Sequence, residues 1–236
     1  MRAEILFPEV CNLYGDLQNI HYLKRCCAEL EIVETDLHTK PAFLDGGISL
    51  VFMGSTTEQG LRLAADALRP WRDAIAEKVD GGQLFLATGN ALDILGQYIE
   101  SDAAPRIEGL GLLDTHAEYH MLRRHNSYYV GKFGDMDIVG FKSLFGHSHG
   151  TGEPLFTTVK GVGRDGQEHS GEGFRRGGLM ATALIGPLLI LNPPLCKWFL
   201  RELGAPSDAL LFEKAAMDSY EKRVAEFLEP DRSWKY

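Results

Sequence analysis

The residues whose position most suggests a chemical role are Thr88-Gly89-Asn90, where an apolar run is followed by a helical pattern. A strand that turns sharply into a helix has the geometry of a nucleophile elbow, which presents one side chain at the carboxyl end of a parallel sheet. The N-terminus of the helix that follows favours negative charge at this point. Because any strand–helix turn of a parallel sheet has the same pattern, the pattern alone does not identify a catalytic site.

The histidines and cysteines do not form a metal-binding pattern. His116, His120 and His125 fall in a segment predicted to be extended, so the helical spacing of a ligand pair is absent. The 147–149 pair of histidines lies in a glycine-rich loop without a neighbouring cysteine, and this loop lacks the lysine of a phosphate loop. The four cysteines, at positions 11, 26, 27 and 196, form no Cys-x-x-Cys pair. We therefore predict no metal site and no cofactor.

The elements that must position the turn at Thr88-Gly89-Asn90, called the corner below, follow an alternating pattern. Short apolar runs alternate with amphipathic helical patterns, which predicts a mostly parallel sheet flanked by helices. Strands are predicted at 4–7, 32–35, 49–53 and 83–87, and helices at 17–30, 57–75 (crossed by Pro70) and 91–100. In the second half, 109–113, 128–133 and 137–141 are predicted as strands joined by hairpins, and 143–178 mostly as loop. Two last helices are predicted at 194–203 and 207–228, the second capped by Ser207 or Asp208.

Composition bounds the class of protein. A single domain over residues 1–236 is expected, because no repeat or low-complexity linker divides the chain. The net charge is −9 without a basic stripe, so we expect no nucleic-acid partner. The most apolar stretch, 179–191, has 13 residues interrupted by Gly186-Pro187, too few to span a bilayer, and no signal peptide is recognised. A cytoplasmic location without membrane association is expected.

Several motifs follow one another in a fixed order along almost the whole chain. In the first half they are Asn12-Leu-Tyr-Gly-Asp-Leu-Gln-Asn19, Val51-Phe-Met-Gly54, Glu58-Gln59 and the segment 86–98. In the second half they are Gly109-Leu-Gly-Leu-Leu-Asp114, Gly140-Phe141, Gly171-Glu-Gly173, Gly186-Pro-Leu-Leu189 and Asn192-Pro193. This series, over residues 4–203, resembles the class I glutamine amidotransferases of the cobyric acid synthase type. It is similar to the glutaminase subunits of lipid II isoglutaminyl synthases. The resemblance implies a flavodoxin-like α/β fold.

The same resemblance shows departures at the positions that carry the family's chemistry. Gly89 stands where the family has its catalytic cysteine, and Ile185 where it has its histidine before Gly-Pro-Leu-Leu. The loop that begins at Gly54-Ser55 is two residues shorter than the family's oxyanion loop. With Asn90, these residues define a vestigial pocket. The resemblance also points to Arg124 as the arginine that binds the ligand's carboxylate. The alternative is that Arg124 is an exposed arginine of a hairpin, because the segment from Asp114 to Gly131 that contains it is about four residues longer than in the family.

These departures decide the functional expectation. Glutamine hydrolysis in this family needs a thiolate that attacks the amide and an imidazole that carries the proton. Glycine offers no nucleophile and isoleucine accepts no proton. We therefore predict a pseudoenzyme that acts as a binding or regulatory subunit of a Mur-ligase-like amidating synthetase, in peptidoglycan or cobalamin amidation. Glutamine or a related amide would be held without cleavage.

Two alternatives stay open from the sequence. The first is an active enzyme with a displaced nucleophile in the same pocket, either Cys11 or Thr88, assisted by polar groups at Ser55, Asn90 and Asp93. A polar pocket with a strongly perturbed carboxylate would favour this alternative, whereas a pocket filled by Ile185 or Leu92 would favour the silent subunit. The second is a homo-oligomeric structural protein. The sequence does not indicate the oligomeric state.

Overall fold

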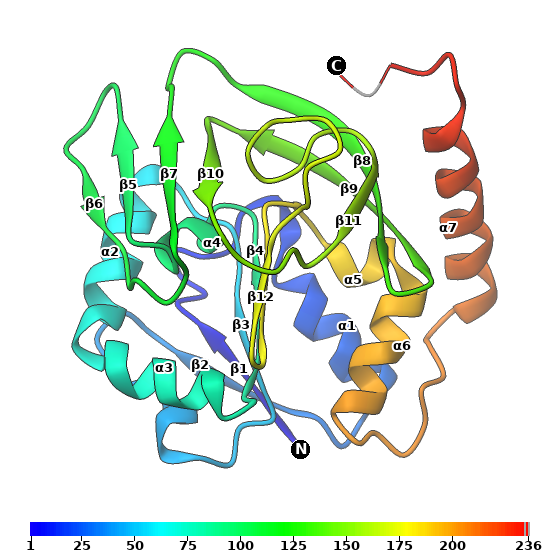
Figure 1. Ribbon diagram of the computed structural model, residues 1–236. Helices are drawn as coiled ribbons and strands as arrows, with labels where there is room; N and C mark the ends of the chain where they lie inside the picture. The colour runs from blue at the N-terminus through cyan, green and yellow to red at the C-terminus, as the bar shows by residue number, and fades with distance from the viewer. Residues whose placement is uncertain (234, 236) are drawn as a thin grey trace.

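The computed structural model describes residues 1–233 and residue 235, and its centre is a six-stranded sheet (Figure 1). The strands are β1 (Arg2–Leu6), β2 (Glu31–Thr35), β3 (Leu50–Met53), β4 (Leu84–Thr88), β12 (Phe174–Arg176) and β13 (Leu179–Thr182). They are ordered β12-β13-β4-β3-β1-β2, and each pairing is parallel except that of β12 with β13. The predicted mostly parallel α/β fold is confirmed.

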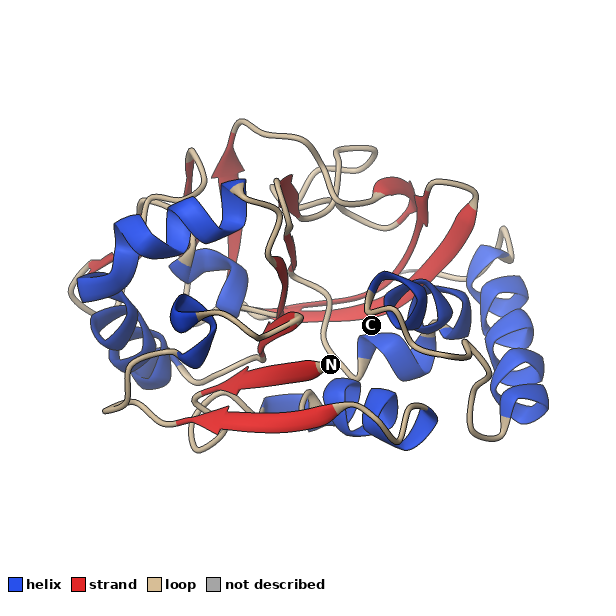
Figure 2. Ribbon diagram, turned by 90° about the horizontal axis from the view of Figure 1, so that it is seen from below, coloured by secondary structure: helices blue, strands red, loops and turns tan. Residues whose placement is uncertain are grey.

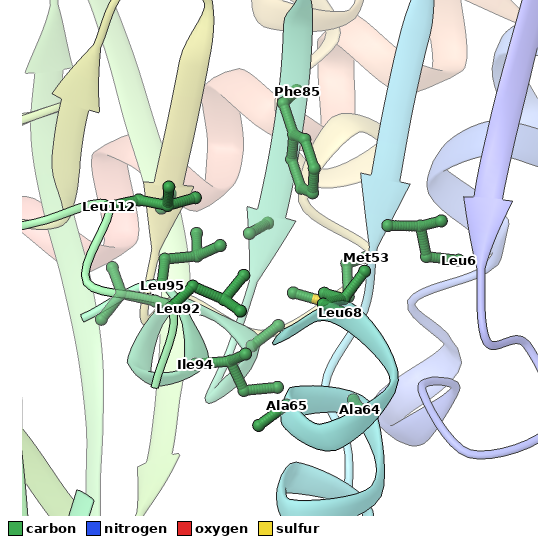
Figure 3. Close-up of a cluster of buried hydrophobic side chains, with 14 of the residues drawn as sticks. Leu6, Met53, Ala64, Ala65, Leu68, Phe85, Leu92, Ile94, Leu95 and Leu112 are labelled. Carbon is green, nitrogen blue, oxygen red and sulfur yellow. The ribbon is translucent and has the colours of Figure 1, made fainter. Parts of the chain in front are cut away.

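Helices cover both faces of this sheet. One face carries α2 (Glu58–Leu68), α3 (Arg72–Asp80) and the short α4 (Ala91–Ile94), whose side chains form one core with Val51 and Met53 of β3 (Figure 3). The other face carries α1 (Gln18–Cys26), α5 (Leu188–Leu191) and α6 (Pro193–Glu202), which pack on Leu50 and Phe52 of the same strand. Because side chains alternate along a strand, the uninterrupted apolar run of β3 supplies both cores.

The second half of the chain adds two smaller sheets above the carboxyl ends of the central strands (Figure 1). The first contains β5 (Tyr98–Ser101), β6 (Ile107–Glu108), β7 (Thr115–Tyr119) and β10 (Gly146–Gly150), in the order β10-β7-β5-β6. The second contains β8 (His125–Phe133), β9 (Met136–Leu144) and β11 (Thr157–Lys160), with β8 and β9 forming the expected hairpin. The C-terminal α7 (Glu213–Leu228) packs on β8 and β9 at the periphery (Figure 2).

The predicted helix at 91–100 was wrong beyond its first turn. α4 ends at Ile94, and β5 follows almost at once. A Cβ on Gly96 would lie 2.6 Å from the Thr115 Oγ1, so the chain passes too close to β7 for a continuing helix to fit. The predicted strand at 109–113 is instead an irregular segment, because its backbone N–H groups bond back to carbonyls at 94–97.

Other boundaries also differ from the predictions. The helix expected over 57–75 is divided by a 3-10 turn at Arg69–Trp71 that contains Pro70. α7 begins at Glu213 and not at 207, because Asp208 pairs with Arg201 and caps nothing. Segment 143–178, expected mostly as loop, contains β10, β11 and β12. Within the described residues, no helix is both long and apolar enough to cross a membrane.

Candidate functional site

The corner after β4 is a left-handed residue with no side chain. Gly89 has φ +60°, and its N–H donates to the Leu184 carbonyl at 3.0 Å, which ties the corner to the chain beyond β13. A Cβ built on Gly89 would lie 1.9 Å from the Ser55 Oγ and 3.4 Å from the Ile185 Cγ2. The backbone therefore keeps the sharp turn of a nucleophile elbow, while the hydroxyl of Ser55 takes the space that a side chain would need.

Beneath the corner lies a buried carboxylate that the sequence did not single out. One oxygen of Asp16, Oδ2, accepts hydrogen bonds from the Ser55 N–H (2.8 Å), the Ser55 Oγ (2.6 Å) and the Thr88 Oγ1 (2.9 Å). Burial raises the pKa of Asp16, and the bonds from Ser55 and Thr88 oppose that rise. The other oxygen, Oδ1, lies against Gly186, whose backbone also opposes the rise in pKa. The carboxyl of Asp16 therefore joins the first loop to Ser55, Thr88 and Gly186.

The loop after β3 is bound to the corner by Asn90. Its side-chain oxygen accepts from the Thr56 N–H at 2.9 Å, and its side-chain nitrogen donates to the Thr56 carbonyl at 2.8 Å. The N–H of Ser55 is already used by Asp16. Two successive backbone donors of this loop are therefore bonded inside the protein and do not point at a ligand.

Gly89, Asn90, Ile185 and Arg124 line a single pocket of about 160 Å³ between the central sheet and the two smaller sheets. Ser55 and Gly54 are buried beneath it and do not line it. The predicted positions, distant in sequence, therefore meet in space at one place.

The pocket wall also carries Asp93, on the first turn after the corner. Its two oxygens accept hydrogen bonds of 2.6 Å from the Tyr119 hydroxyl of β7 and from the Ser148 hydroxyl of β10. Loss of water around the carboxyl raises its pKa to about 6, and the two hydroxyls oppose that rise. The side chain is partly exposed, because it faces the cavity. The sequence left its orientation open.

Arg124 reaches the pocket from the loop that connects β7 to β8, two strands of different sheets. It donates to the Ser143 Oγ at 3.2 Å, and its guanidinium lies 4.2 Å from the centre of the Phe145 ring. A second arginine of the wall, Arg164, was not predicted, because it belongs to the glycine-rich segment. It donates to the Gly173 carbonyl at 3.0 Å and to the Gly152 carbonyl at 3.1 Å.

Comparison of the chain with known proteins identifies the family to which it belongs. Residues 3–189 match the model of the CobB/CobQ-like glutamine amidotransferase domain. The chain belongs to this family. It is 26% identical over 202 residues to the lipid II isoglutaminyl synthase (glutamine-hydrolyzing) subunit GatD of Streptococcus pneumoniae, covering 80% of this chain and 75% of that one. It is 24% identical over 211 residues to GatD of Staphylococcus aureus, covering 88% and 86%.

Solved structures support the fold of this CobB/CobQ-like domain. PurLQS from Thermotoga maritima superposes with a TM-score of 0.54 at 16% identity, covering 94% of this chain and 98% of the other. A glutamine amidotransferase superposes with a TM-score of 0.56 at 17% identity, covering 86% and 99%. At these identities the likeness concerns the fold alone.

The two displaced nucleophiles considered from the sequence do not reach the pocket of this amidotransferase-family chain. Cys11 is buried in the apolar core, and burial raises the pKa of its thiol to about 12, so the thiolate is scarce at neutral pH. Thr88 is buried and donates its hydroxyl to Asp16. Of the two apolar residues whose presence in the pocket would favour the silent subunit, Leu92 belongs to the core and Ile185 lines the pocket. The described residues contain no group of three or more His, Cys, Asp or Glu side chains that would hold a metal ion.

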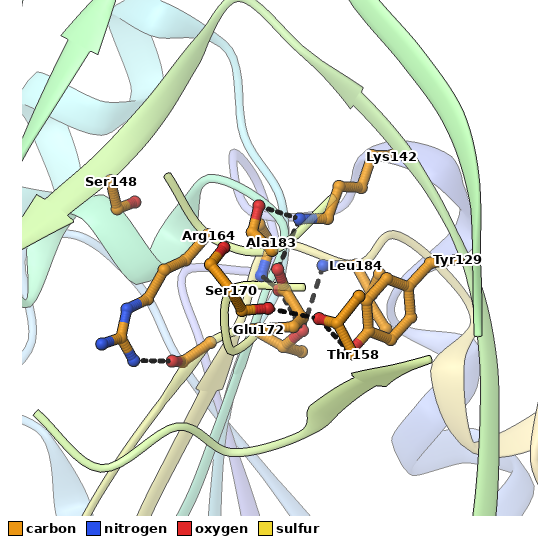
Figure 4. Close-up of polar contacts among 12 residues, drawn as sticks. Tyr129, Lys142, Ser148, Thr158, Arg164, Ser170, Glu172, Ala183 and Leu184 are labelled. Atoms are coloured by element: carbon orange, nitrogen blue, oxygen red, sulfur yellow. Dashed lines mark hydrogen bonds and ion pairs between the residues drawn. The ribbon is translucent and has the colours of Figure 1, made fainter. Parts of the chain in front are cut away.

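A buried ion pair supports the wall above the corner (Figure 4). Lys142 of β9 contacts Glu172, with both side chains fully buried, and donates to the Gly163 carbonyl at 2.8 Å. Glu172 in turn accepts from the Thr182 hydroxyl at 2.9 Å and the Ala183 N–H at 2.8 Å. The pair therefore joins the glycine-rich segment to the end of β13, immediately before Ile185.

Proposed function

We propose that this chain is a subunit of a Mur-ligase-like amidating synthetase that binds a small ligand at the corner but does not hydrolyse glutamine. The observation that carries the proposal is the Ser55 Oγ, 1.9 Å from where a Cβ on Gly89 would lie. Gly89 is at the position of the family's cysteine in the registration of the motifs. At the position where the family has its thiol, the hydroxyl of Ser55 fills the space, which supports the proposal that glutaminase activity has been lost.

The chemistry around the corner supports the same conclusion. Ile185, at the registered position of the histidine, lines the pocket and accepts no proton. The N–H groups of Ser55 and Thr56 are bonded to Asp16 and Asn90, so they do not stabilise an oxyanion. Removing triad members from a hydrolase typically costs several orders of magnitude in rate.

The partner is proposed from the relatives. Both GatD proteins are named as subunits of lipid II isoglutaminyl synthase, and the chain aligns with most of their length. We therefore favour cell-wall amidation over cobalamin amidation. All four cysteines of this chain are free, which is usual in a reducing compartment, so we place the assembly in the cytoplasm.

The test is ammonia release from glutamine by the purified chain, alone and with the Mur-ligase-like synthetase encoded nearby. We expect no release above the rate without protein, together with co-purification of the two chains. Staphylococcus aureus GatD serves as the active control. Turnover comparable to that control would refute the loss of glutaminase activity, and failure to co-purify would refute the partner.

One observation favours a second candidate, an enzyme with different chemistry. Asp93 has a pKa raised to about 6 and lines the pocket, which suits a general acid or base acting with water as the nucleophile. Hydrolysis of any small amide by the wild-type chain that disappears in Asp93→Asn would support this candidate. Activity equal in both proteins would eliminate it.

A further inference from the structure

Asp93, on the pocket wall, forms no ion pair with a lysine or arginine among the described residues. Both oxygens of Asp93 are hydrogen-bonded to hydroxyls, at 2.6 Å from Tyr119 and 2.6 Å from Ser148, and neither hydroxyl brings charge. Among the described residues, neither a lysine nor an arginine is a cause of its pKa shift or forms an ion pair with it. Near Asp93, Glu172 adds like charge, and His149 is the basic group that acts on it.

Such an acid favours a cationic ligand. A carboxylate offers about four lone-pair sites, of which the two hydroxyls use two. Desolvation disfavours the ionised form, and a cation supplied by a ligand would reverse that effect. Both an amide and an ammonium group can donate to an ionised carboxylate, but the ammonium group adds Coulomb attraction and is therefore the better partner for Asp93.

The opposite charge of the pocket is provided by Arg124. A guanidinium has five N–H donors, and Arg124 uses one nitrogen on the Ser143 Oγ, while its face lies over Phe145. Arg164 differs, because its nitrogens are bonded to the carbonyls of Gly152 and Gly173. Arg124 is therefore the arginine of this wall that retains most donors for a ligand.

We propose that the corner pocket binds a small molecule with a primary ammonium group, with Asp93 as its counter-ion and Arg124 as the contact for a carboxylate. This inference rests on the proposed function, in which the pocket binds a ligand that it does not cleave. It changes the class of ligand from a terminal amide to a terminal amine.

The test compares two probes that differ in one group, 5-aminopentanoate and 5-hydroxypentanoate, by titration calorimetry at pH 7.5. The wild-type chain is expected to bind the amine roughly tenfold more tightly or better, the range typical of a hydrogen bond between charged groups. Asp93→Asn is expected to bind the two probes equally. Arg124→Gln is expected to weaken both probes by the same factor. Thermal unfolding of each variant checks that it is folded.

Glu118→Gln is the matched control, because it removes one negative charge from β7 at a residue outside the pocket. It should keep the preference for the amine. Equal binding of both probes by the wild type would overturn the inference. A preference that survives in Asp93→Asn would also overturn it, and would assign the counter-ion to Glu58, the other acid of the wall.

A pH series adds an independent measurement. The preference for the amine should fall as the pH drops through about 6, where Asp93 takes up a proton. The charged groups around it are Glu172, His149, Glu58, His147 and the two arginines, and they are the same in Asp93→Asn, which should show no such fall. Glutamine turnover by the wild type would refute the proposed function and leave the probe preference standing. Equal probe binding without turnover would refute the inference alone.

Discussion

The filling of the corner by Ser55 leads to a quantitative prediction for Gly89→Ala. The new alanine would have a φ of +60°, a left-handed conformation that costs a residue with a side chain about 1–2 kcal/mol. It would also lie 1.9 Å from the Ser55 Oγ and 2.9 Å from its Cβ, an overlap of the kind that costs about 1–3 kcal/mol. The contact with Ile185, at 3.4 Å, is close to ordinary and adds little. We therefore expect the free energy of unfolding to fall by about 2–5 kcal/mol.

The same substitution in a Ser55→Gly background separates the two contributions. There the overlap is gone, so Gly89→Ala should cost only the backbone contribution of about 1–2 kcal/mol. The four proteins form a double-mutant cycle, measured by urea denaturation with tryptophan fluorescence, and its coupling should be about 1–3 kcal/mol. An equal cost in both backgrounds would refute the reasoning that Ser55 occupies the place of a side chain at this corner.

Three further substitutions test the supports of the site. Lys142→Met should lower the free energy of unfolding by about 3–5 kcal/mol, because it leaves the Glu172 charge buried without its partner. The double variant Lys142→Met with Glu172→Leu should recover much of this loss, as measured by thermal denaturation. Thr57→Ala should cost about 1 kcal/mol, because it removes the side-chain acceptor of the Gly60 N–H at the start of α2, whereas serine should retain it; urea denaturation distinguishes them. The wild type should gain stability relative to Asp93→Asn as the pH falls from 6 towards 4. The pKa of Asp93 is raised from 3.8 to about 6 in the folded protein, so the charged carboxyl destabilises the folded state above pH 6. Protonation of the carboxyl removes this cost as the pH falls below 6. A difference between these two proteins that stays constant from pH 7 to 4 would contradict the burial of a charged carboxyl.

The sequence was sufficient for four of the six central strands, β1 to β4, which lie within a residue or two of the predicted strands. β1, β3 and β4 are buried almost throughout, and such strands are short apolar runs between turns. β2 is a half-exposed edge strand, and β12 and β13 were not predicted. β5, β6 and β7 were missed. They are short, of mixed composition, and held by partners distant in sequence. α4 was predicted too long, since the close approach of Gly96 to Thr115 has no local signal.

For the site, the order of the motifs predicted which positions would be found together, and Gly89, Asn90, Ile185 and Arg124 do line one pocket. Their roles stay a prediction. The contacts that define the chemistry were not predictable, because each joins loops from different parts of the chain. Asp16 lay inside a quoted motif, but nothing in the sequence distinguished it from Glu9 as the acid beneath the corner. Arg164 and Ser148 had no such signal, since a glycine-rich segment carries no periodicity.

The two hydrogen bonds between the Asn90 side-chain amide and the Thr56 backbone have a consequence for ligand recognition. The floor of the pocket is fixed in advance of binding, because its side-chain and backbone groups already satisfy one another. Discrimination among ligands then falls to the opposite side, where Arg124 comes from the loop between β7 and β8 and Ser148 from β10. New specificities in this scaffold should therefore be sought by exchanging residues 143–148, with the base of the cavity left untouched.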